Sequence, residues 1–410
     1  MHRGRRYKVI LRWRVSKRAR QWITKGVSPD AQSHKCAGQQ SRSERDFNFT
    51  MKTRSLLVRL AASTAQIATM LAVAMVAGAS AQNPYPQQQP GYPQQSGQSK
   101  PAGQTSPQAS DAELQAAKKV QSAPDPATAL QAAAEFVKKY PKSEIMMQVA
   151  RITAGKIAAL TDANQKVTFS ETYQNTFKSP EYEDIILPTL VDGLTKANRT
   201  DEAFQKADAY LQRHPDDVAM LTQMALVGAE LIRSRNTKYV PQAQKYGASA
   251  IALIEADKKP ADLSDADWTQ YKTKWLGQLY QSSGLLAMVA GDQAGAKGKL
   301  EKAIAANPYE PFSYLLLGQL ANNQYQVLAN QYKSMVPGAE QEAALKKALE
   351  QMDQIIDYYA HAVALSEGIP QYKQLHDQVM QDLETFYKYR HKSADGLQQL
   401  IDKYKKPANG

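Results

Sequence analysis

Three stretches of thirteen residues share one layout, and this internal repetition constrains the fold more than any other feature of the chain. They are ALQAAAEFVKKYP from Ala129, AFQKADAYLQRHP from Ala203 and AKGKLEKAIAANP from Ala296. Their last residues are Pro141, Pro215 and Pro308. The first, fifth and eighth positions lie on one helical face. They hold Ala129, Ala133 and Phe136, then Ala203, Ala207 and Tyr210, then Ala296, Leu300 and Ala303. The pattern predicts three equivalent helices, each packed through one face and ended by a proline.

These stretches resemble the second helix of a tetratricopeptide (TPR) repeat, where small residues stand at the helix crossing and a proline follows. The residues after Pro308 resemble the next first helix, with Tyr314, Leu317 and Gly318 at its aromatic, leucine and small positions. Gly284 is a further packing position. The three prolines are 74 and 93 residues apart, which leaves room for one degenerate repeat of about 34 residues in each interval. The resemblance implies a right-handed α-solenoid of about six or seven helix hairpins.

The whole region 111–410 has helical periodicity, and we interpret it as one all-α repeat domain. We expect thirteen or fourteen helical segments and no strand. Two long helices are predicted at about 309–334 and 340–366, and a last helix in GLQQLIDKYKKP. The motif LGQL occurs at 276–279 as well as near Gly318, seven residues too early for its own second helix. A first helix lengthened by two turns explains that offset.

Charge is concentrated at the start of the chain. The formal net charge is +12, but residues 1–81 hold 16 Lys and Arg against 3 Asp and Glu. Residues 82–410 therefore hold 35 basic and 36 acidic residues, a net charge of −1. A body with balanced charge has no electrostatic attraction to phosphate backbones. We accordingly expect no nucleic-acid partner.

Residues 51–81 have the layout of a secretory signal peptide. Lys52, Arg54 and Arg59 precede an apolar stretch, and the small residues Ala79 and Ala81 mark a cleavage site after Ala81. The apolar stretch is too short and too interrupted for a stable membrane span. No cysteine follows it, so a lipoprotein anchor is not expected, and we expect a periplasmic or secreted protein. Residues 1–50 are interpreted as a non-native upstream extension from an early start; a genuine Arg-rich leader is the alternative.

Residues 82–110 are rich in Pro, Gln, Gly and Ser and have almost no aliphatic side chains. Such a segment cannot bury enough apolar area to offset its chain entropy, so we expect a disordered linker. The alternative is a docking tail that offers Tyr and Pro to an aromatic groove.

No motif in the chain predicts catalysis, a cofactor or a metal. GDQAGAKGK has Gly298 and Lys299 followed by Leu300, which does not fit a phosphate-binding loop. We instead expect Gly291 to end one helix and Asp292 to cap the next. The only cysteine, Cys36, lies upstream of Met51, so the mature chain would have no disulfide and no thiolate metal site. The acidic stretches SPEYEDI and LSDADW are interpreted as helix N-termini, and the histidines as surface or packing residues.

The TPR resemblance also implies a concave groove. Its second, fifth, ninth and twelfth positions from Pro311 are Phe312, Leu315, Gln319 and Asn322. We expect a non-catalytic scaffold that binds a protein or peptide of the cell envelope. The alternative is a cell-wall or glycan-associated accessory protein, or a hydrolase whose carboxylates come together only in the fold. A homo-oligomer is a third possibility, suggested by the long helices after residue 309.

Overall fold

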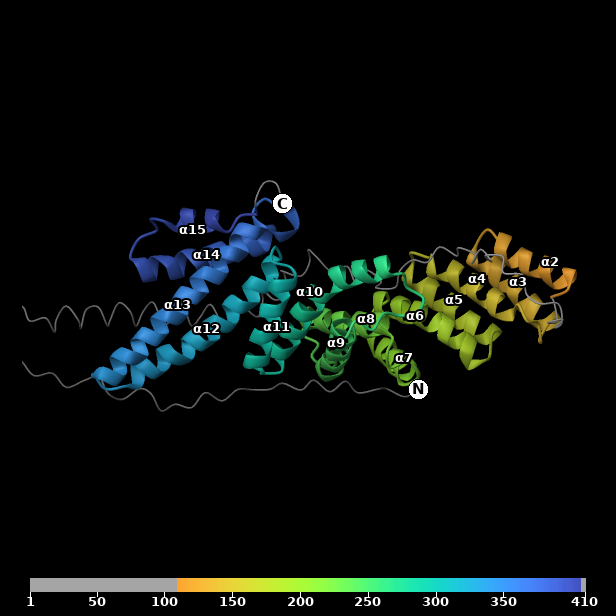
Figure 1. Ribbon diagram of the computed structural model, residues 1–410, viewed down its shortest axis with the longest axis horizontal. Helices are drawn as coiled ribbons and strands as arrows, with labels where there is room; N and C mark the ends of the chain where they lie inside the picture. Colours follow the sequence, from red (N-terminus) through yellow and green to blue (C-terminus); the bar gives the residue numbers. More distant parts are fainter. Residues whose placement is uncertain (1–108, 407–410) are drawn as a thin grey trace, which may run out of the picture. The chain divides into compact units, whose positions relative to one another are not determined.

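The computed structural model describes residues 109–406, and this part of the chain is all-helical. It contains fourteen α-helices, two short 3-10 helices and no strand. The α-helices, labelled as in Figure 1, are α2 (Asp111–Ser122), α3 (Pro126–Lys139), α4 (Met146–Ala158), α5 (Ala163–Thr176), α6 (Pro180–Lys196), α7 (Thr200–Arg213), α8 (Val218–Leu231), α9 (Val240–Glu255), α10 (Asp265–Val289), α11 (Gln293–Ala306), α12 (Pro311–Ser334), α13 (Ala339–Ser366), α14 (Lys373–His391) and α15 (Leu397–Lys403). The 3-10 helices are η2 (Ile232–Ser234) and η3 (Pro370–Tyr372). The expected all-α class is confirmed for this range.

The expected upstream extension (1–50), the expected signal peptide (51–81, with Ala79 and Ala81) and nearly all of the expected linker (82–110) lie outside the described residues. Across residues 109–406, no helix is both long enough and apolar enough to span a lipid bilayer.

Each helix packs mainly against its neighbours in chain order. The principal contacts within residues 109–406 join consecutive helices, such as α8 with α9 and α12 with α13, or helices two places apart, such as α4 with α6. The colours of Figure 1 show the same order, because helices of adjacent colour lie together. Two apolar clusters follow this order, one drawn from residues 120–186 and the other from residues 167–303. Successive helices therefore share successive sections of the core.

The three helices with the repeated layout end in the same way. Helices α3, α7 and α11 are followed by Tyr140, His214 and Asn307, with φ between −126° and −142°. Each of these residues donates its backbone N–H to the carbonyl four residues earlier. The proline that comes next has no N–H to continue the helix. The first, fifth and eighth residues of the three repeated stretches are between 0% and 8% exposed. The equivalence seen in the sequence therefore extends to backbone and burial.

Small residues let paired helices approach closely. A Cβ atom at Gly284 on α10 would stand 2.7 Å from Cγ of Leu300 on α11. A Cβ atom at Gly318 on α12 would overlap the ring of Tyr359 on α13. Because glycine has no Cβ, the partner side chain occupies that space in both pairs. The close contact of α10 with α11 and of α12 with α13 therefore depends on glycine at positions 284 and 318.

Helices α7 and α9 lie alongside each other in matching register. The Tyr239 hydroxyl, at the start of α9, donates to Asp201 on α7, and the Tyr246 hydroxyl donates to Asp208. Gln242 adds a bond of 2.8 Å from Nε2 to Asp208 Oδ2. Both the two aspartates and the two tyrosines are seven residues apart, which is about two helical turns. The two helices must therefore run parallel, as helices two places apart do in a stack of hairpins.

The predicted long helices are present. Helices α12 and α13, at Pro311–Ser334 and Ala339–Ser366, match the expected ranges closely. Helix α10 has 25 residues whereas α8 has 14, so the helix that carries LGQL at 276–279 is indeed extended. The predicted last helix corresponds to α15.

Candidate functional site

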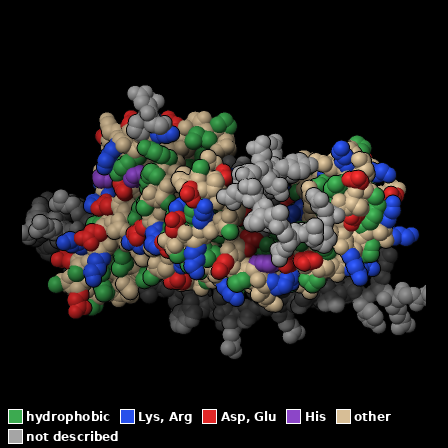
Figure 2. All heavy atoms as spheres, turned by 45° about the vertical axis from the view of Figure 1, so that its right-hand side comes forward, with side chains coloured by type: hydrophobic (Ala, Val, Ile, Leu, Met, Phe, Trp, Pro, Cys, Tyr) green, Lys and Arg blue, Asp and Glu red, His purple; other side chains and the backbone are tan. Residues whose placement is uncertain are grey.

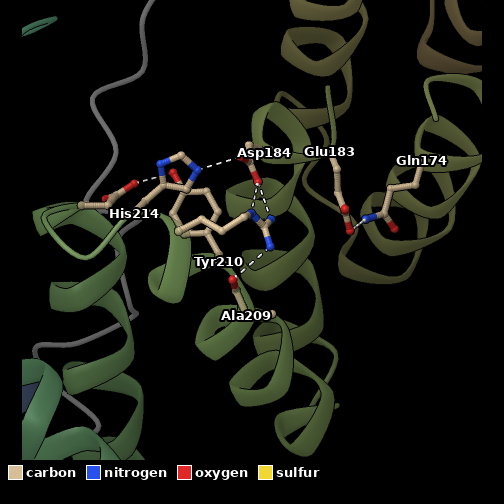
Figure 3. Close-up of polar contacts among 8 residues, drawn as sticks. Gln174, Glu183, Asp184, Ala209, Tyr210 and His214 are labelled. Carbon is tan, nitrogen blue, oxygen red and sulfur yellow. Dashed lines mark hydrogen bonds and ion pairs between the residues drawn. The ribbon is translucent and has the colours of Figure 1, made fainter. Parts of the chain in front are cut away.

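A polar network joins α6 to the end of α7 and the start of α8 (Figure 3). Asp184 projects from α6 and accepts hydrogen bonds from the last residue of α7 and the residue after it. Its Oδ1 accepts from Nε of Arg213 at 3.2 Å and from Nη2 of the same guanidinium. Its Oδ2 lies 2.7 Å from Nε2 of His214. One carboxylate thus binds an arginine and a histidine side chain at a helix end.

The other side of the network fixes the turn into α8. The Tyr210 hydroxyl donates to Oδ2 of Asp217 at 2.6 Å, and the Tyr210 ring packs 4.6 Å from the imidazole of His214. Oδ1 of Asp217 accepts the backbone N–H of Met220 at 2.9 Å and so caps α8. Asp217 therefore links the end of α7 to the start of α8.

The pKa shifts in the network follow from burial and from these bonds. Burial alone would raise the pKa of Asp184, but hydrogen bonds from Arg213 and His214 outweigh burial and hold this pKa below its usual range. The hydrogen bond to Asp184 also raises the pKa of Arg213. Burial, and then the charge of Asp217, raise the pKa of the Tyr210 hydroxyl. The network therefore keeps Asp184 and Arg213 ionised and Tyr210 neutral near pH 7.

The network is suited to holding helices together. Its ionised groups are bonded to each other, and Nε2 of His214, the nitrogen that could otherwise face a reactant, is engaged by Asp184. The neighbouring Glu183 faces α5 instead, where it accepts from Nε2 of Gln174 at 3.1 Å (Figure 3). The contacts explain why α5, α6 and α7 keep their positions at this junction.

The four predicted groove residues lie on the first three turns of α12. Phe312, Leu315, Gln319 and Asn322 are between 3% and 5% exposed. Residues 311–322 are all buried in this structure, as are residues 218–229 of α8. Nε2 of Gln326 donates to Oδ1 of Asn322 at 3.2 Å. The four side chains offer no open surface in this structure, and their role in binding stays a prediction.

The glycine-rich stretch before α11 is a helix junction, as expected. Gly291 has a φ of 84° after α10, and Oδ1 of Asp292 accepts the backbone N–H of Gly295 at 2.8 Å. Lys297, Gly298 and Lys299 lie inside α11. A phosphate-binding loop needs backbone N–H groups that point at the ligand, and inside a helix those groups are bonded to the preceding turn.

The acidic stretches also lie where they were expected. SPEYEDI begins α6, with Ser179 at the N-cap position, and LSDADW begins α10, with Ser264 as N-cap. Oγ of Ser264 accepts the N–H of Asp267 at 3.1 Å. Carboxylates in a first turn are stabilised by the helix dipole, so helix initiation accounts for both clusters. Within residues 109–406, no group of three or more His, Cys, Asp and Glu side chains is arranged to hold a metal ion.

An aromatic stack on α13 was not anticipated. The imidazole of His361 lies between two tyrosine rings, 4.5 Å from that of Tyr314 on α12 and 3.5 Å from that of Tyr404 after α15. The Tyr404 hydroxyl donates to Asp357, one turn before His361. Burial lowers the pKa of His361. The stack attaches the C-terminal segment to α13, which fits the expected packing role of the histidines.

Comparison with known protein families finds no family model that matches this chain. No curated protein sequence is significantly similar to it either. Arguments about function therefore depend on the residues and contacts of this chain.

Sequence reasoning identified the helix ends of the network but not its bonds. His214 and Pro215 were assigned to a repeat end, and the acidic stretch around Asp184 was assigned to a helix start. The contact between Asp184 and His214 spans 30 residues. One signal was available. Helices α6 and α7 follow each other directly, so a carboxylate near the start of α6 lies near the end of α7 when the two helices pack antiparallel.

Proposed function

We propose that this chain is an exported, non-catalytic α-solenoid of TPR type that binds a protein or peptide of the cell envelope. Two observations together carry the proposal: the same helix ending occurs three times, and the principal contacts join helices one or two places apart. In a solenoid each repeat touches only the repeats beside it, so long faces of the stack are left free to bind a partner.

The fourteen α-helices of the described region can be grouped as seven hairpins, from α2 with α3 to α14 with α15. Small-residue contacts at Gly284 and Gly318 fall between the two helices of a hairpin. The Asp201–Tyr239 and Asp208–Tyr246 bonds join second helices of successive hairpins. A right-handed superhelix of such hairpins is the finer arrangement that we propose for this all-helical chain.

The charge distribution favours a protein partner over nucleic acid. Residues 82–410 have a net charge of −1, and Figure 2 shows acidic and basic side chains interspersed on the face that it displays. A nucleic-acid surface needs a continuous basic stripe. The TPR resemblance assigns binding to Phe312, Leu315, Gln319 and Asn322 on α12, which are buried in this structure, so a partner would have to displace neighbouring side chains to reach them. Their mixture of apolar and amide side chains is suited to an extended peptide or a partner helix.

The proposed binding role can be tested by comparing two variants of α12. We expect an envelope protein that crosslinks to the full-length chain to be lost from a variant with Gln319→Ala and Asn322→Ala. The matched control is Asn323→Ala, an exposed amide on the same helix, which should retain the crosslinked protein. Circular dichroism would establish that both variants are folded. Equal crosslinking of all three proteins would contradict a role for the α12 residues in binding.

The proposed export can be tested separately. The protein recovered from the periplasm or medium should begin at Gln82, and Ala79→Leu should prevent that cleavage because signal peptidase requires small residues there. N-terminal sequencing gives the result directly. Protein retained in the cytoplasm with an intact N-terminus would overturn the proposed location. The binding role would then depend on the crosslinking result alone.

A further inference from the structure

The distal part of the α12–α13 hairpin carries an unusual concentration of exposed apolar side chains. We call residues 327–349 the distal arm. Seven large hydrophobic side chains are classed as exposed within residues 109–406, and four of them lie in the arm. They are Val327 at 57%, Met335 at 37%, Val336 at 85% and Leu345 at 37%. Single exposed apolar residues are ordinary, but several at one end of a hairpin make that end a candidate interaction surface, and Leu345 is the one of the four that lies on α13.

Helix α14 covers one side of the hairpin and then ends. Arg390, in its last turn, donates to both carboxylate oxygens of Asp353 on α13, at 2.7 Å and 3.0 Å. Helical spacing places Leu349, Leu345 and Glu342 on the same side of α13 as Asp353. Figure 1 shows that the turn between α12 and α13 lies well beyond the end of α14. Among residues 109–406, the side of α13 that α14 covers at Asp353 is left open along the arm, where Glu342, Leu345 and Lys346 are exposed.

The arm has contacts of its own between α12 and α13. Nε2 of Gln341 donates to the carbonyl oxygens of Tyr332 at 3.3 Å and Met335 at 3.2 Å, which ties α13 to the end of α12. Ala344 and Ala348 are buried on the side of α13 opposite the uncovered residues, at 8% and 4% exposure. The uncovered side is therefore presented on an ordered helix, with Leu345 accessible.

The charges of the arm and its next turn are balanced and ordered along α13. On the side of α13 that carries Leu345, Glu342 lies nearer the tip and Lys346 lies one turn further in, with its Nζ 4.0 Å from Oε1 of Glu350. Balanced charge gives no attraction to anionic lipid or nucleic acid. An acidic residue nearer the tip and a basic residue one turn further in are complementary to the same helix face turned around. This is the requirement for a two-fold symmetric interface.

We propose that two copies of this chain dimerise through the uncovered side of the distal arm. The two α13 helices pack antiparallel, with the two-fold axis at the level of Ala344. Leu345 of each copy then packs near the axis, and Leu349 lies one turn further from it. Glu342 of each copy stands opposite Lys346 of the other, so that two ion pairs border the apolar contact.

The ion pairs allow a charge-exchange test by sedimentation velocity on the full-length chain. The unsubstituted protein should be dimeric at micromolar concentration. Glu342→Lys or Lys346→Glu alone should weaken the dimer by about tenfold or more, because like charges then face each other twice. Combining both substitutions should restore it. The control, Lys347→Glu, makes the same charge change on a side of α13 away from Leu345 and should leave the dimer intact.

Several results would overturn the proposal. One is an unsubstituted protein that stays monomeric up to about 100 μM, far above the micromolar range of typical specific complexes. Another is a dimer whose dissociation constant is unchanged by Glu342→Lys. A third is a double variant that dimerises no more tightly than either single variant. A monomer that co-sediments with phosphatidylglycerol vesicles would assign the arm to a membrane surface instead. The side chain of Lys346 is 80% exposed, so these substitutions leave the fold of the arm intact.

Discussion

At the residue scale, Gly318 shows how tightly the chain is packed at one helix crossing. A methyl group at this position would overlap the buried ring of Tyr359, which is only 2% exposed and has Phe386 at 6.2 Å between ring centres. The ring has no room to move aside. We therefore expect Gly318→Ala to lower the free energy of unfolding by about 1–3 kcal/mol. Chemical denaturation followed by circular dichroism measures the change.

The matched control is Gly298→Ala on α11. Gly298 is also inside a helix, but a Cβ atom there would meet nothing within 4 Å. Alanine is the better helix former, so this substitution should raise the free energy of unfolding by about 0.5–1 kcal/mol. If the two substitutions had the same sign, the close approach at Gly318 would not explain its presence.

Asp382 on α14 provides a pH-dependent test at the same scale. Burial raises its pKa from 3.8 to about 6. The folded chain therefore keeps this proton up to about pH 6, whereas the unfolded chain releases it near pH 4. The stability contributed by this group falls as the pH rises between those values and stays lowered above them.

Replacing Asp382 with Asn should therefore stabilise the protein only at higher pH. We expect a gain of about 2 kcal/mol in the free energy of unfolding at pH 7.5 and almost none at pH 4. Denaturation curves at the two pH values give the comparison. Asp377→Asn, which removes an exposed carboxylate paired with Lys373 at 2.6 Å, should give no gain. A gain from Asp382→Asn that was equal at both pH values would show that ionisation is not the cause.

At the element scale, the parallel register of α7 and α9 depends on tyrosine–carboxylate bonds. The Tyr246 hydroxyl donates to Asp208, and burial raises its pKa, so it remains a donor at all ordinary pH values. Tyr246→Phe should lower the free energy of unfolding by about 1–2 kcal/mol. In a double-mutant cycle with Asp208→Asn, the coupling should be about 1 kcal/mol. Strictly additive effects would mean that this bond does not hold the two helices in register.

At the scale of the whole molecule, the two apolar clusters predict that a disruptive core substitution unfolds only the helices near it. Phe136, 1% exposed, belongs to the cluster of residues 120–186. Phe136→Asp should abolish amide protection in α2 to α5 but preserve it in α10 to α14, because a repeat stack transmits strain only to adjacent repeats. Hydrogen exchange detected by mass spectrometry resolves the two regions. Loss of protection throughout the chain would indicate one cooperative core and would contradict the solenoid proposal.

The converse substitution is the control for this experiment. Leu300, 0% exposed, holds the same position in α11 as Ala133 does in α3. Leu300→Asp should remove protection from α10 to α12 and leave α2 to α5 protected. If each variant loses protection only around its own substitution, unfolding spreads locally. If the same helices lose protection in both variants, those helices are simply the less stable part of the molecule.

Short-range pattern was sufficient to predict the helices. Alanine at fixed spacing located the packed faces of α3, α7 and α11, and the following prolines located their ends, because proline removes the N–H that the next turn requires. Asp292 marked a helix start through a side-chain bond that reaches only three residues along the chain. These features depend on neighbouring residues, and the sequence alone determined them.

The contacts between distant residues were decided only by tertiary structure. The bond from His214 to Asp184 and the stack of Tyr314, His361 and Tyr404 join residues 30 to 90 positions apart, and no periodicity marks them. The burial of Gln319 and Asn322 was likewise not evident, since amides on a helix are compatible with an exposed groove. Helical periodicity specifies which side of a helix is apolar, but the angle and offset at which two helices pack determine which polar side chains meet.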